Sequence, residues 1–148
     1  MNKILQEQFF VDDLSDDQKA VITDMNHYIK DSLNGQESAV AIIQGAAGTG
    51  KSVVLMQLVR QYMTDKRYRT SLVVNHPELY KAYQDLAESI PNMKASAIRR
   101  PTSLINYAQK NHKQYDIIFV DEAHLLYSKS EPYAHYRGQN QLTDLMNL

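Results

Sequence analysis

Three glycines, a lysine and a serine gather in one stretch of the first hundred residues, Gly45-Ala46-Ala47-Gly48-Thr49-Gly50-Lys51-Ser52. The stretch matches the pattern G-x-x-x-x-G-K-S/T, in which glycine lets successive backbone N–H groups point at an anion because no Cβ blocks that geometry. At this spacing Lys51 reaches the β- and γ-phosphates of a nucleotide, and the Ser52 hydroxyl is a ligand for Mg²⁺. The stretch therefore predicts a P-loop that binds a nucleoside triphosphate.

An acidic pair, Asp121-Glu122, follows the apolar run Ile117-Ile118-Phe119-Val120. Such a run indicates a buried strand, and a strand ending here would place Asp121 near the Mg²⁺ that Ser52 also contacts. Glu122 is positioned to orient and polarise a water molecule for attack on the γ-phosphate. We interpret the pair as a Walker B motif, a weak signal alone that gains weight beside a P-loop. His124 either senses the γ-phosphate and couples it to a bound polymer, or is an ordinary turn histidine.

Apolar runs and helix-start signals alternate along the chain and place both motifs at the ends of strands. Strands are predicted at residues 39–44, 70–75 and 116–120, and the segment 95–98 is either a short strand or a loop. Residues 128–138 are predicted to form a mobile loop. Strands that alternate with helices indicate a parallel α/β sheet, which binds ligands at the carboxyl ends of its strands. Helices are predicted at residues 15–34, 50–63, 77–89, 101–111 and 139–148.

The composition describes an ordinary globular chain. Its 148 residues are enough to bury one core, and 22% of them are charged. The net charge of −1 gives no general attraction to nucleic acid, so any such binding must come from a local groove. The sequence contains no apolar run of about eighteen residues, so no membrane span is predicted. The absence of cysteine suits a cytoplasmic protein. The five histidines show no ligand spacing with acidic partners, so no structural metal is expected.

Basic clusters and a group of tyrosines are weaker candidates for contacts with nucleic acid. The basic clusters at residues 66–69, 99–100 and 110–113 are able to contact phosphates, but we interpret them mainly as solvated surface. Three tyrosines near the predicted mobile loop would either stack on bases or serve packing, and packing is favoured: Tyr127, Tyr133 and Tyr136.

Taken together, the motifs resemble those of superfamily 1 helicases. The resemblance is carried by Leu14, the run Gln18-Lys19-Ala20-Val21, the glycine-rich stretch and the run Val120-Asp121-Glu122-Ala123-His124. The tetrad Asp-Glu-Ala-His also occurs in superfamily 2, but the glycine-rich stretch and Gln18 fit superfamily 1 better. The longer run from Asp121 to Leu142 is similar to the Schlafen group 3-like DNA/RNA helicase domain. This resemblance covers most of residues 14–148.

The resemblance implies a fold and a set of roles. The fold would be a three-layer α/β/α P-loop NTPase (RecA-like) with a parallel sheet. Lys51 would bind phosphate, Ser52 and Asp121 would hold Mg²⁺, Glu122 would activate water, and Gln18 would read the adenine of ATP. Nucleotide contacts would come from Gln18 and from Gly45, Ala46, Ala47, Gly48, Thr49, Gly50, Lys51 and Ser52. Asn75 and residues 101–104 match the places where such proteins contact single-stranded DNA or RNA.

The resemblance also predicts how the chain is organised. Residues 1–13 form an N-terminal segment and residues 14–148 a partial RecA-like ATPase domain, incomplete at its C-terminal side. In the family fold a further strand lies between residues 39–44 and 116–120, and a second RecA-like lobe follows. Both are expected in the full-length protein, and direct pairing of the strands at 39–44 and 116–120 would contradict this topology.

Three functions share these motifs. The leading expectation is an ATP-binding, Mg²⁺-dependent ATPase domain of a superfamily 1-like DNA/RNA helicase or translocase. The alternatives are an ATP-switched regulatory or defence module that unwinds nothing, and a nucleotide-binding fragment with negligible hydrolysis. No arginine finger is recognised, and its absence lowers turnover by about 10³–10⁵ in related NTPases. We therefore expect hydrolysis by this chain alone to be very slow.

Overall fold

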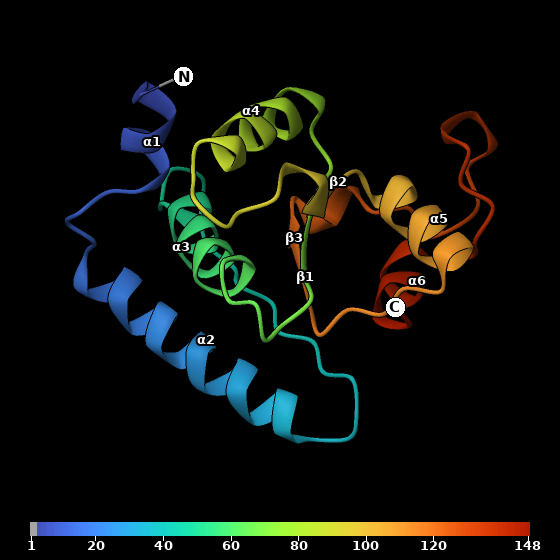
Figure 1. Cartoon of the computed structure of the whole chain (residues 1–148), viewed down its shortest axis with the longest axis horizontal. Coiled ribbons are helices and arrows are strands. Elements are labelled where there is room, and N and C mark those ends of the chain that lie inside the picture. The colour runs from blue at the N-terminus through green and yellow to red at the C-terminus, as the bar shows by residue number, and fades with distance from the viewer. Residues whose placement is uncertain (1–2) are drawn as a thin grey trace.

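The computed structural model describes residues 3–148 and has an α/β fold built on a small parallel sheet (Figure 1). The sheet has three strands in the order β2-β1-β3. The central strand β1 (Thr70–Val74) pairs in parallel with β2 (Ile98–Arg99) and with β3 (Ile117–Asp121). In the register, Leu72 lies between Ile98 on one side and Phe119 on the other. The carboxyl ends of β1 and β3 therefore meet at one edge of the sheet.

Helices cover both faces of this sheet, and they bury β1 on both sides. Leu72 and Val74 pack into a core formed with α3 (Lys51–Met63) and α4 (Pro77–Glu88). Val73 points the other way, into a smaller core with α5 (Pro101–Asn111) and α6 (Gln141–Met146). A strand buried on both faces reads as a continuous apolar run, as Leu72-Val73-Val74 does.

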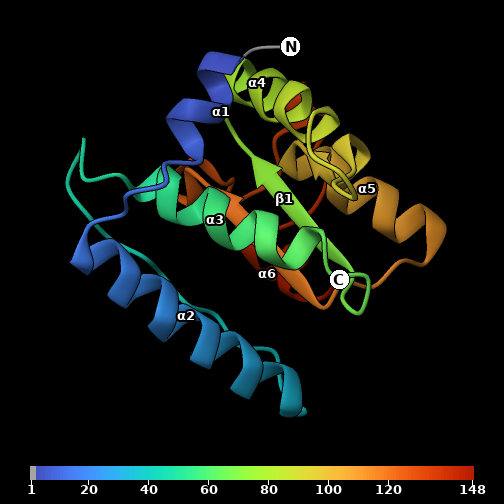
Figure 2. The same ribbon diagram turned by 60° about the vertical axis from the view of Figure 1, so that its left-hand side comes forward.

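Two further helices precede the sheet. The long helix α2 (Asp16–Asn34) lies along the outer side of α3, away from β1 (Figure 2). It begins with a capping box between Ser15 and Gln18, which satisfies backbone N–H groups of its first turn. The short helix α1 (Lys3–Phe9) falls where the sequence predicted only a polar segment. It lies beside α3 and α4 and contributes Phe9, which is 5% exposed, to the larger core.

The predicted strand at residues 39–44 is wrong. These residues adopt no regular secondary structure, and the side chains of Val40 and Ile42 are 44% and 75% exposed. A strand needs hydrogen bonds from a neighbour, and within residues 3–148 β3 pairs with β1 alone. The segment does not pair with β3. Direct pairing of the two would have contradicted the predicted topology.

The predicted mobile loop at residues 128–138 is partly ordered. Glu131 and Tyr136 form an isolated antiparallel bridge around a short 3₁₀ helix at Pro132–Ala134. Tyr136 is 1% exposed, and its hydroxyl donates to Asp144 of α6. Burial of Tyr136 fixes this segment against α6, a contact that composition alone does not reveal.

The predicted boundaries of α2, α3, α4, α5, β1 and β3 agree with the structure to within about two residues. The ambiguous segment 95–98 forms a short 3₁₀ helix (Ala95–Ala97) that leads directly into β2. No helix in the described part of the chain has the length and apolar character needed to cross a membrane.

Candidate functional site

The glycine-rich loop, residues 45–52, leads directly into α3. Gly48 and Gly50 have φ angles of 79° and 78°, a left-handed conformation that side chains with a Cβ rarely adopt. Gly50 is the N-cap of α3, and no side chain caps this helix. The positive end of the helix dipole is therefore directed at the loop. The left-handed backbone thus favours glycine at both positions, of which the sequence pattern specifies only Gly50.

The Lys51 side chain folds back over this loop. Its ammonium donates to the carbonyl oxygens of Gly45, at 2.6 Å, and Ala46, at 2.8 Å. The Thr49 hydroxyl also donates to the carbonyl of Ala46, at 2.8 Å. A methyl group on Gly45 would lie only 2.8 Å from the Thr49 hydroxyl, so the loop is too tight there for a larger residue. The loop is closed around one cationic group.

Gln18 lies against the end of the glycine-rich loop. Its side-chain oxygen accepts from the backbone N–H of Ser15 at 3.0 Å, as part of the capping box of α2. A methyl group added to Gly50 would overlap the Gln18 side-chain nitrogen. The structure thus brings together two residues that lie 32 positions apart in the sequence, and it fills the space beside Gly50 with the Gln18 amide.

Asp121 is the last residue of β3, and protein groups bind both of its carboxylate oxygens. Oδ2 accepts from the Tyr83 hydroxyl at 2.9 Å, and Oδ1 accepts from the backbone N–H of Glu122 at 3.0 Å. The side chain is buried, and burial raises the pKa of Asp121 because a charged carboxylate loses its hydration. The hydrogen bond from Tyr83 opposes that rise in the pKa.

Tyr83 links α4 to the acidic end of β3. It lies on α4, is completely buried, and donates to Asp121. Burial raises the pKa of Tyr83, the charge of Asp121 adds to the rise, and the Ser52 side chain acts in the opposite direction. No sequence pattern signals this contact, since apolar spacing marks Tyr83 only as a core position.

Glu122 and His124 form an exposed pair beyond β3. Glu122 has a φ of 54°, and its carboxylate lies 3.3 Å from Nδ1 of His124. Asn75, at the end of β1, donates to the backbone carbonyl of Glu122 at 3.5 Å. The structure therefore brings Asn75, Glu122 and His124 together at the edge of the sheet where Asp121 also lies.

Most of the other candidate nucleic-acid contacts that can be placed are engaged within the protein, whereas Tyr133 is not. Thr102 accepts from the buried Gln141 at 3.0 Å. Arg99 lies over the ring of Tyr107, with 3.9 Å between the guanidinium carbon and the ring centroid. Tyr136 packs in the smaller core, as the preference for packing predicted, and stacks on Tyr127. Tyr133 is 97% exposed.

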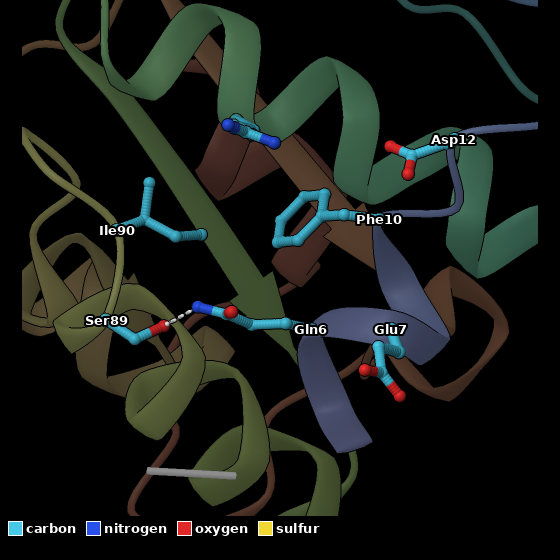
Figure 3. A pocket seen from close by; sticks show the side chains of 7 residues that line it. Gln6, Glu7, Phe10, Asp12, Ser89 and Ile90 are labelled. Carbon is cyan, nitrogen blue, oxygen red and sulfur yellow. Dashed lines mark hydrogen bonds between the residues drawn. The ribbon is translucent and has the colours of Figure 1, made fainter. Parts of the chain in front are cut away.

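A cavity of about 330 Å³ lies elsewhere, between α1, α3 and the chain that follows α4 (Figure 3). Gln6 donates to the Ser89 hydroxyl across it at 2.7 Å, and Phe10 lies under the guanidinium of Arg60. No residue of the glycine-rich loop lines this cavity. Its position therefore gives no support to the predicted nucleotide contacts.

The fold and the site define an α/β domain of P-loop-like architecture, with a glycine-rich loop before one helix and an acidic strand end beside it. The model of the family "Schlafen group 3, DNA/RNA helicase domain" matches residues 38–148. The chain belongs to this family, as the resemblance of its motifs predicted, and is a helicase-like domain.

One curated relative also matches. It is a protein of Saccharomyces cerevisiae that is itself called uncharacterized, 40% identical over 121 residues. The match covers 74% of this chain but 27% of the relative. The chain therefore spans about a quarter of the length of that protein. No solved structure matches the chain.

Proposed function

We propose that the chain is the ATP-binding domain of a superfamily 1-like DNA/RNA helicase or translocase, with a RecA-like fold and Mg²⁺-dependent hydrolysis. The observation that carries the proposal is that α3, which begins at the glycine-rich loop, packs against the sheet in which β3 ends at the buried Asp121. Ser52 and Asp121 come from motifs 69 positions apart in the sequence, and the proposed site requires them on the same cation. Membership of a helicase-domain family supports the same function.

The residues around the loop have the chemistry for a triphosphate. The N-terminus of α3 and the glycine-rich loop offer backbone N–H groups and a helix dipole to an anion. In the proposed bound state, the Lys51 ammonium leaves the carbonyls of Gly45 and Ala46 and binds phosphate oxygens. Gln18, already beside Gly50, contacts the adenine.

The residues also fit Mg²⁺. Ser52 and Asp121 supply a hydroxyl and a carboxylate, which are hard oxygen ligands. Two such ligands are enough, because Mg²⁺ at nucleotide sites completes its shell with phosphate oxygens and water. The described residues hold no cluster of three or more His, Cys, Asp or Glu side chains that would form a separate metal site. When bound, Mg²⁺ would neutralise charge on the phosphates.

Glu122 is the proposed residue that orients the attacking water, and His124 the proposed coupling residue. Their contact at 3.3 Å engages one oxygen of the Glu122 carboxylate, which would slow hydrolysis as long as it persists. This observation supports the alternative of a nucleotide-binding domain with negligible hydrolysis. The ATP-switched module without unwinding uses the same residues, and a strand-displacement assay separates it from a helicase.

The edge of β3 leaves room for a further strand in the proposed RecA-like topology. The side of β3 opposite β1 has no paired strand within the described residues. We propose that a further strand of the same protein pairs with that side and that a second RecA-like lobe completes the site. The short length relative to the yeast protein is compatible with such additional parts.

Binding of a fluorescent ATP analogue in Mg²⁺ buffer tests the proposal. Lys51→Ala should weaken binding by at least about tenfold, since it removes the charge that contacts the phosphates. Lys66→Ala is the matched control because Lys66 is an exposed lysine outside the loop, and it should bind as the wild type does. Equal affinity of the wild type and Lys51→Ala would contradict the proposal.

The nucleic-acid half of the proposal needs a separate measurement. The ATPase rate of the full-length protein should rise when single-stranded DNA or RNA is added. A rate that neither polymer changes would remove the helicase and translocase functions and leave the ATP-switched module.

A further inference from the structure

The buried phenol of Tyr83 is more closely engaged with the candidate site than a core tyrosine needs to be. Its hydroxyl donates to Asp121 Oδ2 at 2.9 Å, and its side chain is completely buried. A core tyrosine is satisfied by any acceptor, including a backbone carbonyl. Here the acceptor is the carboxylate at the end of β3.

The hydrogen bonds at Asp121 leave ligand positions open. Tyr83 donates to Oδ2, and the backbone N–H of Glu122 donates to Oδ1. Each carboxylate oxygen keeps acceptor capacity beyond its one protein donor. A cation or its bound water can use that capacity.

The tyrosine ring is fixed from behind by the first helix. Phe9 of α1 packs edge-on against Tyr83, with ring centroids 5.1 Å apart and an interplanar angle of 70°. Both rings lie in the core formed by α3, α4 and β1. Since the ring cannot shift without disturbing this core, the hydroxyl has one position relative to Asp121.

We propose that Tyr83 is a positioning residue, which holds the Asp121 carboxylate in the orientation that binds the Mg²⁺ of a Mg²⁺–nucleotide complex. The inference rests on the proposed function and adds a residue that the motifs do not contain. Removing a group that orients a metal ligand typically lowers metal affinity by about 10- to 100-fold. Tyr83 acts through Asp121 and contacts neither nucleotide nor cation.

The test compares the affinity for a fluorescent ATP analogue in Mg²⁺ buffer with the affinity in EDTA. The ratio of the two dissociation constants reports the cation alone and cancels any general loss of binding. Tyr83→Phe keeps the ring and removes the hydroxyl. It should reduce the gain in affinity from Mg²⁺ by about tenfold and leave the affinity in EDTA unchanged.

Tyr62→Phe is the matched control. Tyr62 is also a buried tyrosine, and its hydroxyl donates to Asn26 Oδ1 at 2.7 Å, on the side of α3 that faces α2. Its removal costs a hydrogen bond to α2 that does not involve Asp121, so the gain in affinity from Mg²⁺ should equal that of the wild type. If Mg²⁺ raises the affinity of Tyr83→Phe for the analogue as much as it raises that of the wild type, the inference is wrong. The proposal that the chain binds ATP would still stand.

A wild-type chain that binds the analogue in neither buffer would refute the proposed function and this inference with it. If Tyr83→Phe does not fold, an NMR measurement on the wild type tests the inference instead. With tyrosines carrying ¹³C at Cζ, adding Mg²⁺ to the nucleotide-bound chain should shift the Tyr83 signal and leave that of Tyr62 in place. An unchanged Tyr83 signal would overturn the inference.

Discussion

At the scale of residues, the candidate site depends on contacts between side chains that are distant in the sequence. The identities of Gly50, Lys51 and Asp121 were predictable, because each belongs to a short pattern whose chemistry is fixed by residue type and spacing. Tyr83 was not, because a buried tyrosine on an amphipathic helix is an ordinary core residue. Its meeting with Asp121 depends on how α4 packs beside the end of β3, which no local pattern encodes.

Gly48 and Gly50 provide a matched pair for testing the loop. Both have a left-handed φ, so alanine at either position should lower the free energy of unfolding by about 1–2 kcal/mol. A methyl group at Gly48 meets no atom within 4 Å, whereas one at Gly50 overlaps the Gln18 side chain. Gly50→Ala should therefore be the more destabilised variant in urea unfolding.

Adding Gln18→Ala to Gly50→Ala controls for that overlap. If the Gln18 amide fills the space beside Gly50, the added substitution should make Gly50→Ala no more costly than Gly48→Ala. Equal unfolding free energies for the two single variants would show that Gln18 does not contact the loop.

At the scale of elements, local signals determined most helices and two of the three strands. Ser15 with Gln18 marks the start of α2, and Pro77 and Pro101 mark the starts of α4 and α5. Residues 39–44 have the apolar pattern of a buried strand but adopt no strand, because strand formation depends on a neighbour. Helix α1 was not predicted, because it is short and is stabilised by contacts with other helices.

Helix α1 should contribute to stability through Phe9. Phe9→Ala removes a ring that is 5% exposed and packed on Tyr83, so it should cost about 3 kcal/mol in the free energy of unfolding. Gln8→Ala changes an exposed neighbour on the same helix and should have little effect. Urea unfolding of the two variants measures the difference, and an unchanged midpoint for Phe9→Ala would show that α1 does not belong to the folded core.

At the scale of the whole molecule, the parallel sheet brings distant motifs to one edge. Strands β1 and β3 are adjacent and parallel, so Asn75, Asp121 and Glu122 emerge together after their carboxyl ends. Helix α3, whose first residues are Lys51 and Ser52, packs against the same sheet. This convergence was predictable from the alternation of strands and helices, because ligands of parallel α/β sheets bind at the carboxyl ends of strands.

The central claim is that Ser52 and Asp121 serve one cation, and Mn²⁺ in place of Mg²⁺ tests it most directly. With a non-hydrolysable ATP analogue bound, Mn²⁺ should broaden the backbone amide NMR signals of Ser52 and Asp121 together. The signals of Asn26 and Tyr62, on the α2-facing side of α3, should stay sharp under the same conditions. Broadening of only one of the two site signals, or of neither, would contradict the account.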